Sequence, residues 1–431
     1  MARYKSFGDV QSHLDELGMF HMNLGLERMQ AFVAAFEACY GRGPAFRIAH
    51  VVGTNGKGST SAFLENIARC HGLRTGLYTS PHFVSPRERI HVNGSQLGEA
   101  EWVELANETF RLTETVGPTY FEFLTCLAVL AFERAGVQLA VMEAGLGGRY
   151  DATNVLAPDW TLFTPIGLDH EAVLGGTVAA ITEDKADAMR TGAPAFTAPQ
   201  VPEAMTALRR RADELDVALT DTSGFPLPDE RGLGMKGPHQ PENARLAMIA
   251  WEQIAKDIGV PTVPAYLEAA LAATFVPGRL QFVPAEVGNG RPAFLLDGAH
   301  NEHALIALRA ALRAQSVRPA VIIFNCMRDK RLEAMLPLLL GMGDGPVLVP
   351  GIPGNERAAK PEDTAATIGT RAAPVDDMAA ALDHEAAARA AATGGMVLVC
   401  GSLYLLAEFY KLNPRLLGDS GVRGPQGDST T

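Results

Sequence analysis

FRIAHVVGTNGKGST, residues 46–60, is the stretch that decides how the first part of this chain folds. An apolar, β-branched run ends at Val52. Three glycines then surround Lys57, and the residues that follow carry apolar side chains at helical spacing. This pattern predicts a strand, a tight glycine loop and a helix. Glycines let the backbone approach a phosphate closely, and the N–H groups of the loop and the helix start point at the anion.

The loop departs from the standard P-loop, which has glycine where Val51 stands and serine or threonine where Gly58 stands. Lys57 supplies a charge for terminal phosphates, and Ser59 or Thr60 can bind a phosphate oxygen or Mg²⁺. The alternative is a glycine turn with a solvated lysine. Because a strand and a helix flank the loop in the right order, we favour nucleotide binding, and the loop alone leaves the reaction open.

The composition bounds the size and the partners of the protein. Its 431 residues are too many for one core and predict two domains. The net charge of −12 argues against a general nucleic-acid surface, and no apolar run is long enough to cross a membrane. Five widely spaced cysteines form no metal or disulfide pattern, and the N-terminus lacks a signal pattern. We therefore expect a cytoplasmic protein without nucleic-acid or membrane partners.

Three polar residues stand where predicted strands end. They are Ser80 after LRTGLYT, Glu143 after LAVM, and His170 after WTLFTPIGLD. Because parallel strands end at one edge of a sheet, we expect these side chains beside the glycine loop. Oxygen ligands with one imidazole suit Mg²⁺ or Mn²⁺ better than zinc. On spacing alone, Glu143 is equally well a solvated acid, and a lone histidine is usually structural.

Three other residues also have two interpretations. Lys185 lies inside a predicted helix, where a solvated lysine is the simpler explanation. Asn243 stands in the first turns of another helix, where its amide can read a base edge or start the helix. Arg279 follows a rigid Pro-Gly turn that presents it.

The pattern resets near residue 284, where β-α units begin to repeat through MVLVCGSLYLLAEFYKL. Such repetition predicts a second, smaller parallel sheet. We therefore expect one domain over residues 1–283 and another over 284–413. The tail at 414–431 is rich in Gly, Ser and Asp and is predicted to be disordered.

Twelve short motifs together point to one family. They are GLER (25–28), GTNGKGS (53–59), TSPH (79–82), RERI (87–90), YFE (120–122), EAGLGGRYDATN (143–154), GLDH (167–170), EDKA (183–186), HQPENA (239–244), PGRLQ (277–281), DGAHN (297–301) and GSLY (401–404). In this order they resemble the folylpolyglutamate synthase and dihydrofolate synthase family, within the Mur ligase superfamily of ATP-dependent amide-forming ligases.

The resemblance implies a fold and the binding sites for ATP and metal. The fold would be an α/β protein: a P-loop-like Mur-ligase ATPase domain, then a smaller Rossmann-like domain, with ATP between them. The residues implied to bind ATP are Thr54, Asn55, Gly56, Lys57, Gly58, Ser59, Asn243, Arg279 and Asp297. Those implied to bind Mg²⁺, as two ions, are Ser80, Glu143 and His170.

The resemblance also implies catalytic and substrate residues. Lys57 and Lys185 would be catalytic, Lys185 as a carboxylated lysine, while His300 and Ser402 would face the incoming glutamate. The implied pterin pocket is Met22, Asn23, Leu24, Thr119, Tyr120, Phe121, Glu122, Tyr150, Asp151 and Ala152. One departure bears on Lys185: the family's usual Glu-Lys-Ala-Gly reads Asp-Lys-Ala-Asp at residues 184–187.

The implied reaction is ATP-dependent addition of L-glutamate to 7,8-dihydropteroate and to reduced folates, through an acyl phosphate. Two alternatives lie close to it: a folylpolyglutamate synthase alone, and a Mur-type ligase acting on a cell-wall precursor. A third, a P-loop kinase or NTPase switch, predicts ATP turnover that does not depend on an amino acid. We expect a monomer, with a dimer left open.

Overall fold

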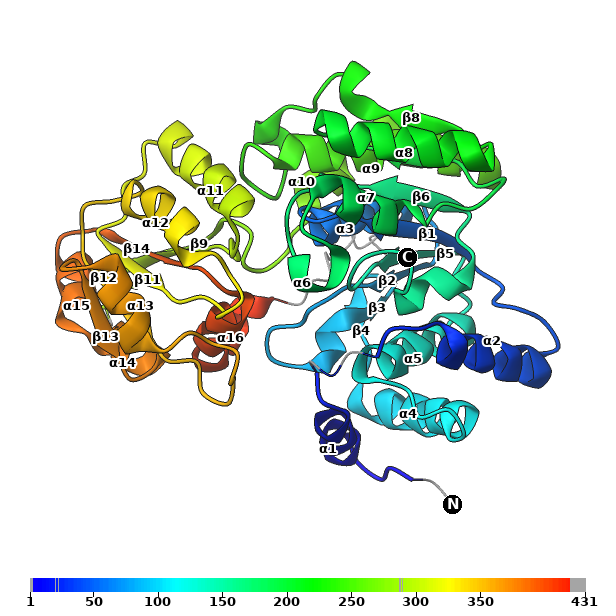
Figure 1. The fold of residues 1–431 in the computed structure, drawn as a ribbon, viewed down its shortest axis with the longest axis horizontal. Helices are drawn as coiled ribbons and strands as arrows, with labels where there is room; N and C mark the ends of the chain where they lie inside the picture. The colour runs from blue at the N-terminus through cyan, green and yellow to red at the C-terminus, as the bar shows by residue number, and fades with distance from the viewer. Residues whose placement is uncertain (1–2, 20, 22, 287, 289, 419–431) are drawn as a thin grey trace, which may run out of the picture. The chain divides into compact units, whose positions relative to one another are not determined.

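The computed structural model describes residues 3–19, 21, 23–286, 288 and 290–418, which group into two compact units. The first comprises the described residues of Met1–Gly232 and Glu242–Thr274, and the second comprises Leu233–Pro241 and Phe275–Gly418. Each unit holds one mixed sheet flanked by helices (Figure 1). The predicted α/β class is therefore confirmed.

The first unit is built on eight strands in the order β4-β3-β2-β5-β1-β6-β7-β8. The strands are β1 Arg47–Val52, β2 Thr75–Tyr78, β3 Ile90–Val92, β4 Ser95–Gln96, β5 Leu139–Glu143, β6 Trp160–Phe163, β7 Ala195–Thr197 and β8 Leu219–Asp221. Strand β1 pairs in parallel with β5 and β6, whereas β3 and β4 add an antiparallel edge. The glycine loop thus follows a central strand, and all of β1 except Arg47 is buried.

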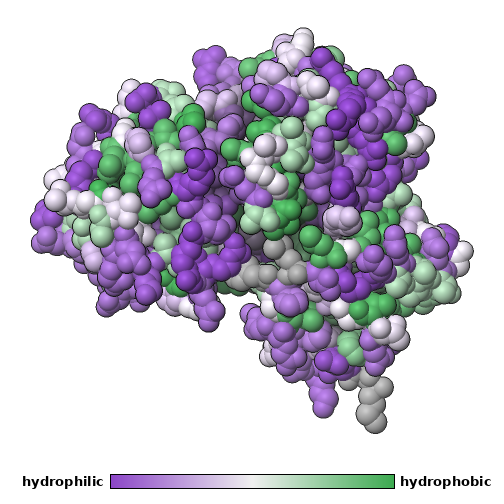
Figure 2. Space-filling view, in the orientation of Figure 1, coloured by the Kyte–Doolittle hydropathy of each residue, from purple (hydrophilic) through white to green (hydrophobic). Residues whose placement is uncertain are grey.

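Helices cover both faces of this sheet, with α4 and α5 on one side and α3 and α10 on the other (Figure 1). The helices are α1 Phe7–Leu17, α2 Glu27–Tyr40, α3 Lys57–Cys70, α4 Glu99–Thr113, α5 Tyr120–Arg134, α6 Glu171–Leu174, α7 Val178–Ala186, α8 Pro202–Leu215, α9 Gln240–Ile258 and α10 Pro264–Ala273. Short 3₁₀ turns are η1 Pro86–Arg89, η2 Ala152–Leu156, η3 Thr222–Gly224 and η4 Glu230–Gly232. The outer surface over α8 is largely hydrophilic (Figure 2).

The second unit holds six strands in the order β13-β12-β11-β14-β10-β9, with only β9 antiparallel to its neighbour among the described pairings. The strands are β9 Gln281–Val283, β10 Ala293–Leu296, β11 Val321–Phe324, β12 Val347–Pro350, β13 Ala372–Val375 and β14 Met396–Cys400. The helices are α11 Glu302–Ala314, α12 Leu332–Leu340, α13 Pro361–Ile368, α14 Met378–Asp383, α15 Glu385–Ala392 and α16 Leu403–Leu412, followed by η6 Pro414–Leu417.

The ends of the predicted domains differ in detail from these units. Residues 275–283, placed in the first domain from the sequence, group with the second unit, because β9 pairs with β10. At the chain's end, Pro414–Leu417 forms a 3₁₀ turn, although this stretch was predicted to be disordered. The rest of that tail, residues 419–431, lies outside the described residues. None of the described helices combines the length and apolarity needed to span a bilayer.

Candidate active site

The glycine loop after β1 is held by the segment that follows β6. The backbone N–H groups of Thr54 and Asn55 both donate to the Pro165 carbonyl, at 3.1 and 3.2 Å. The Thr54 hydroxyl lies within hydrogen-bond distance of both the carbonyl (3.1 Å) and the amide (3.2 Å) of Gly167. Hydrogen bonds to Pro165 and Gly167, in the segment just after β6, therefore hold the loop in place.

Gly56 ends the loop and caps α3 in a left-handed conformation, with φ of 90°. A Cβ atom there would collide with the amide oxygen of Asn243, so the first turn of α9 lies directly against the loop. The Lys57 ammonium folds back over the loop and donates to the carbonyls of Gly53 (3.3 Å) and Thr54 (3.4 Å). Lys57 and Asn243, predicted to bind ATP from separate motifs, thus meet at one loop.

Glu143, at the end of β5, joins this group. Its side chain is buried, with 4% of the residue exposed, and its Oε2 accepts the Ser80 backbone N–H at 3.0 Å. Both Glu143 oxygens lie beside Gly58, because a Cβ atom there would be 3.5 Å from Oε2. Two of the three predicted metal ligands, Ser80 and Glu143, therefore adjoin the glycine loop.

His170 lies farther along its segment than the sequence indicated. Strand β6 ends at Phe163, because Pro165 lacks the N–H that a strand needs, and His170 instead begins α6 with a φ of 52°. Its side chain is exposed, and its backbone N–H is bonded to the Asp169 carboxylate at 2.9 Å. In the part of the chain that is described, no three His, Cys, Asp or Glu residues are grouped for a metal ion. The set with Ser80 and His170 stays a prediction.

Lys185, near the end of α7, is buried rather than solvated, with 4% of the residue exposed. Burial, followed by the positive charge of Lys57, lowers the pKa of its amine from 10.5 to about 7, against the opposing effect of Asp184, Asp151 and Asp169. The amine is therefore partly neutral at neutral pH. A Cβ atom on Gly148 would lie 2.7 Å from the Lys185 Cα, so the glycine-rich loop after β5 packs directly on this turn.

Asp151 organises the loop at residues 145–154 from inside. One carboxylate oxygen accepts the Leu146 N–H at 2.8 Å, and the other accepts both the N–H and the hydroxyl of Thr153. The group is buried, and burial raises its pKa above the usual value despite these bonds. Asp151 was predicted to bind a pterin; in this structure its carboxylate holds its own loop.

A buried chain continues from Asp151 into the central strand. The Thr153 hydroxyl also lies 2.7 Å from Nε2 of His50 on β1. Since a carboxylate only accepts, Thr153 donates to Asp151 and accepts from His50 Nε2–H. Burial, with a contribution from Arg190, lowers the pKa of His50 to about 3, so the imidazole is neutral. Its Nδ1 has no hydrogen-bond partner among the described residues.

Thr119 and Glu122 form the capping box that starts α5. Glu122 accepts the Thr119 N–H at 2.8 Å, and its carboxylate is also paired with Arg28, whose Nε lies 2.8 Å away. Arg28 reaches in turn to the backbone carbonyl of Asn23. Arg28 had no predicted role, although it stands in the GLER motif at residues 25–28.

The aromatic members of the predicted pterin set connect α5 to the 145–154 loop. Phe121 lies against Gly145 and is tilted against Tyr78, with ring centroids 5.6 Å apart. Tyr120 is buried, and the Arg89 guanidinium lies 5.4 Å from its ring centroid. Ala152 is buried at the start of η2. Met22 lies outside the described residues.

A cavity of about 230 Å³ opens beside this loop. Two of the predicted pterin residues line it, and both are half-exposed: Leu24 (54%) and Tyr150 (49%). The remaining lining residues are Leu146, Arg149, Val173, Leu174, Ala180, Glu183 and Asp184. A slot with aliphatic walls and a tyrosine suits a flat ring, while its charged residues suit a polar edge.

The second unit gathers its predicted residues around the ends of β10 and β14. Asp297 is buried and accepts the N–H groups of Leu280 and Ala299, both at 2.9 Å. Burial raises the Asp297 pKa, and the positive charge of Arg279 opposes that rise. His300 Nδ1 contacts the Gly298 carbonyl at 2.8 Å.

Ser402 caps α16 just beyond β14, the parallel neighbour of β10. Its hydroxyl accepts the Tyr404 N–H at 3.1 Å, and the Gly401 N–H donates to Ala299 at 2.8 Å. Ser402 therefore shares one sheet edge with Asp297. The Ser402 hydroxyl also caps the N-terminus of α16, which was not predicted from the sequence.

Comparison with known proteins identifies a matching family model and several relatives. A family model described as the Mur ligase glutamate ligase domain matches residues 278–403. A Bacillus subtilis dihydrofolate synthase/folylpolyglutamate synthase is 32% identical over 365 residues, which is 78% of this chain and 83% of the relative.

Two solved structures resemble the whole fold. Escherichia coli FolC in complex with DHPP and ADP has a TM-score of 0.83 at 27% identity, covering 96% of this chain and 99% of that one. The Yersinia pestis bifunctional folylpolyglutamate synthase/dihydrofolate synthase, complexed with AMPPNP and a Mn ion, has a TM-score of 0.79 at 28% identity, with the same coverage of 96% and 99%.

Proposed function

Because this chain belongs to the folylpolyglutamate synthase/dihydrofolate synthase family of ATP-dependent ligases, we propose that it joins L-glutamate both to 7,8-dihydropteroate and to reduced folates. One observation carries the proposal. The 145–154 loop packs on Lys185 through Gly148 and lines the cavity through Leu146 and Tyr150. We therefore place the pteridine in that cavity, with its carboxylate end toward the group that includes Lys185, Lys57 and Glu143.

The reaction proceeds in two steps. The substrate carboxylate attacks the γ-phosphorus of ATP, which releases ADP and leaves an acyl phosphate. The amine of L-glutamate then attacks the acyl carbon, and phosphate departs as the amide forms. Phosphoryl transfer depends mainly on positioning and charge neutralisation. In this proposal Lys57 supplies the charge, and the start of α3 positions the phosphates.

The buried carboxylate of Glu143, beside Ser80 and Gly58, fits a divalent cation by its chemistry, because hard oxygen donors are the ligands Mg²⁺ prefers. His170 is the third residue of the proposed set. When bound, the cation supplies positive charge against phosphate and carboxylate oxygens. The Y. pestis relative was solved with a Mn ion.

We propose that Lys185 is carboxylated. A neutral amine attacks CO₂ with its lone pair and then loses a proton, which leaves a carbamate anion. Burial, which lowers the Lys185 pKa to about 7, favours the neutral form that this step needs. The product anion is compatible with a cation at Glu143, whereas an ammonium would repel it.

The second unit supplies the glutamate side of the reaction in this proposal. His300 and Ser402 face the incoming amino acid, while Arg279 and Asp297 contact the nucleotide. The protein acts as a monomer in the cytoplasm, where its five cysteines stay reduced; all five are free in the structure.

The assay that tests the function is ADP release with each pteridine, with and without L-glutamate. Release that requires both the pteridine and glutamate is the expected result. Activity with reduced folate but not with dihydropteroate would reduce the protein to a folylpolyglutamate synthase. ATP turnover without any dependence on an amino acid would reject the ligase.

A further inference from the structure

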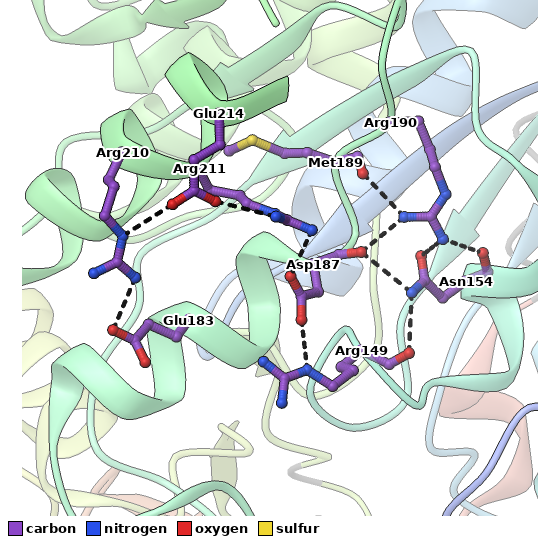
Figure 3. A network of polar contacts seen from close by, with 9 residues as sticks. All are labelled: Arg149, Asn154, Glu183, Asp187, Met189, Arg190, Arg210, Arg211 and Glu214. Atoms are coloured by element: carbon purple, nitrogen blue, oxygen red, sulfur yellow. Dashed lines mark hydrogen bonds and ion pairs between the residues drawn. The ribbon is translucent and has the colours of Figure 1, made fainter. Parts of the chain in front are cut away.

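Arg149 lines the cavity from a network of arginines and acids that joins the 145–154 loop to α7 and α8 (Figure 3). Its Nε is paired with Asp187, whose other oxygen lies 2.9 Å from Arg211. The network continues from Arg211 through Glu214 and Arg210 to Glu183. Asp187 therefore fixes Arg149 by one nitrogen only.

The two terminal nitrogens of Arg149 have no hydrogen-bond partner among the described residues. Figure 3 shows both directed away from Asp187. The side chain is about half-exposed, at 48%. A guanidinium held at Nε with both terminal amino groups available is a planar donor pair that matches a carboxylate.

The acids around the cavity are already engaged. Glu183 accepts from Arg210 at 2.9 Å, and Asp184 accepts the Gly148 N–H at 2.9 Å. Within the network, Glu183, Asp187 and Glu214 are each paired with at least one arginine. Among the described residues that line the cavity, Arg149 is therefore the positively charged one, and its terminal nitrogens are available to a ligand.

Arg149 also lies close to the proposed reaction centre. Its backbone N–H donates to the Asp184 carbonyl at 2.9 Å, one residue before Lys185. A substrate whose reacting carboxylate lies near Lys185 therefore has atoms a few bonds away within reach of this side chain. A glutamyl substrate carries a second carboxylate on a short carbon chain from the reacting one.

We propose that Arg149 is a specificity-determining residue that binds the α-carboxylate of folate substrates, with Asp187 as its positioning residue. The inference rests on the proposed function. Dihydropteroate ends in a single benzoate and has no such carboxylate, so Arg149 distinguishes the two substrate classes. The same loop then serves both reactions, but only glutamyl substrates use the guanidinium.

The test measures KM and kcat for 7,8-dihydropteroate, for a reduced folate monoglutamate, and for that folate with its α-carboxylate converted to an amide. In the wild type we expect the amide to raise KM on the order of 10-fold or more, as for a lost charge-assisted pair. Arg149→Gln should raise KM for the folate by a similar factor and abolish the discrimination against the amide, while KM for dihydropteroate should rise by a clearly smaller factor. Arg149→Lys should restore part of the folate affinity, and Asp187→Asn should raise the folate KM with little effect on kcat.

Arg209→Gln is the control for loss of a nearby arginine. Arg209 lies on α8 next to Arg210 of the network, but it pairs with Asp221, outside the network. Equal KM increases for dihydropteroate and folate, or an increase for ATP instead, would overturn the inference. The wild-type comparison with the amide needs no variant, so equal KM values there would overturn it even if Arg149→Gln fails to fold. Wild type without activity on either pteridine would reject the proposed function itself, and the inference with it.

Discussion

The glycine loop and the 145–154 loop follow neighbouring parallel strands, β1 and β5, yet they use their side chains in opposite ways. In the glycine loop the backbone is bonded to Pro165, and the Lys57 ammonium donates to two carbonyls of the loop itself. In the other loop, Asp151 is a buried acceptor that holds three groups of its own segment. Backbone contacts therefore fix the shape of the first loop, whereas a buried carboxylate fixes the shape of the second. We propose that Lys57 is thereby left to bind a ligand.

The largest expected effect comes from Lys57→Ala. Removing the charge that faces developing phosphate charge should lower the rate on the order of 100-fold or more. The melting temperature should stay near that of the wild type, because the Lys57 ammonium bonds only to carbonyls of a backbone that other bonds already hold. Steady-state kinetics measure the loss of rate, and thermal melts measure the melting temperature. Near-normal turnover would remove Lys57 from the phosphate site.

Lys185→Ala should be nearly as damaging, for a different reason. The variant loses the proposed carbamate, so a short carboxylic acid added to the assay should restore part of the activity. A short amine at the same concentration is the control. Rescue by the amine instead of the acid would show that Lys185 acts as an amine and would reject carboxylation.

Asp151→Ala should cost both stability and substrate affinity, in contrast with Lys57→Ala. Three donors lose a buried acceptor, which should lower the free energy of unfolding by about 1–3 kcal/mol. Chemical denaturation measures that loss, and KM for dihydropteroate and for a reduced folate measures the effect on the cavity. An unchanged denaturation midpoint would mean that the loop does not depend on its carboxylate, and the comparison of the two loops would fail.

The smallest effect concerns pH. The Lys185 pKa is about 7 in the folded protein and near 10.5 when exposed, so between these values the unfolded state binds more protons. The free energy of unfolding attributable to this group therefore rises with pH across that window, and the full cost of burial is present below pH 7. Lys185→Met should raise the melting temperature by roughly a few degrees more at pH 6 than at pH 10, in CO₂-free buffer. An equal change at both pH values would contradict the buried amine.

Local patterns in the sequence were enough for the strand, glycine loop and helix, and for the strand ends at Ser80 and Glu143. They failed where partners are distant along the chain. Arg28 and Glu122 are 94 residues apart, and His50 reaches Thr153 across 103 residues. Such contacts depend on how strands and helices pack, which periodicity does not encode.

The burial of Lys185 was also not predicted, because a lysine in a nine-residue helix is expected to be exposed to solvent. Only the close packing of Gly148 shows why water is excluded. The predicted strand end at His170 was wrong for a simpler reason. Pro165 ends the strand early, and the segment then leads into α6. The apolar run in the sequence extends to Ile166, so it did not indicate this earlier end.

The division of the chain into units has a consequence for how the protein can be taken apart. Residues Leu233–Pro241 belong to the second unit, although the first unit resumes at Glu242, within the same helix α9. The chain therefore passes from one unit to the other more than once, and no single cut yields two intact pieces. A fragment ending at Thr274 would carry Leu233 and Met235, both 2% exposed in the whole protein, without the sheet of their own unit. An isolated first unit would therefore include a segment that groups with the other unit in the whole protein, and that segment contains two apolar side chains that are buried there.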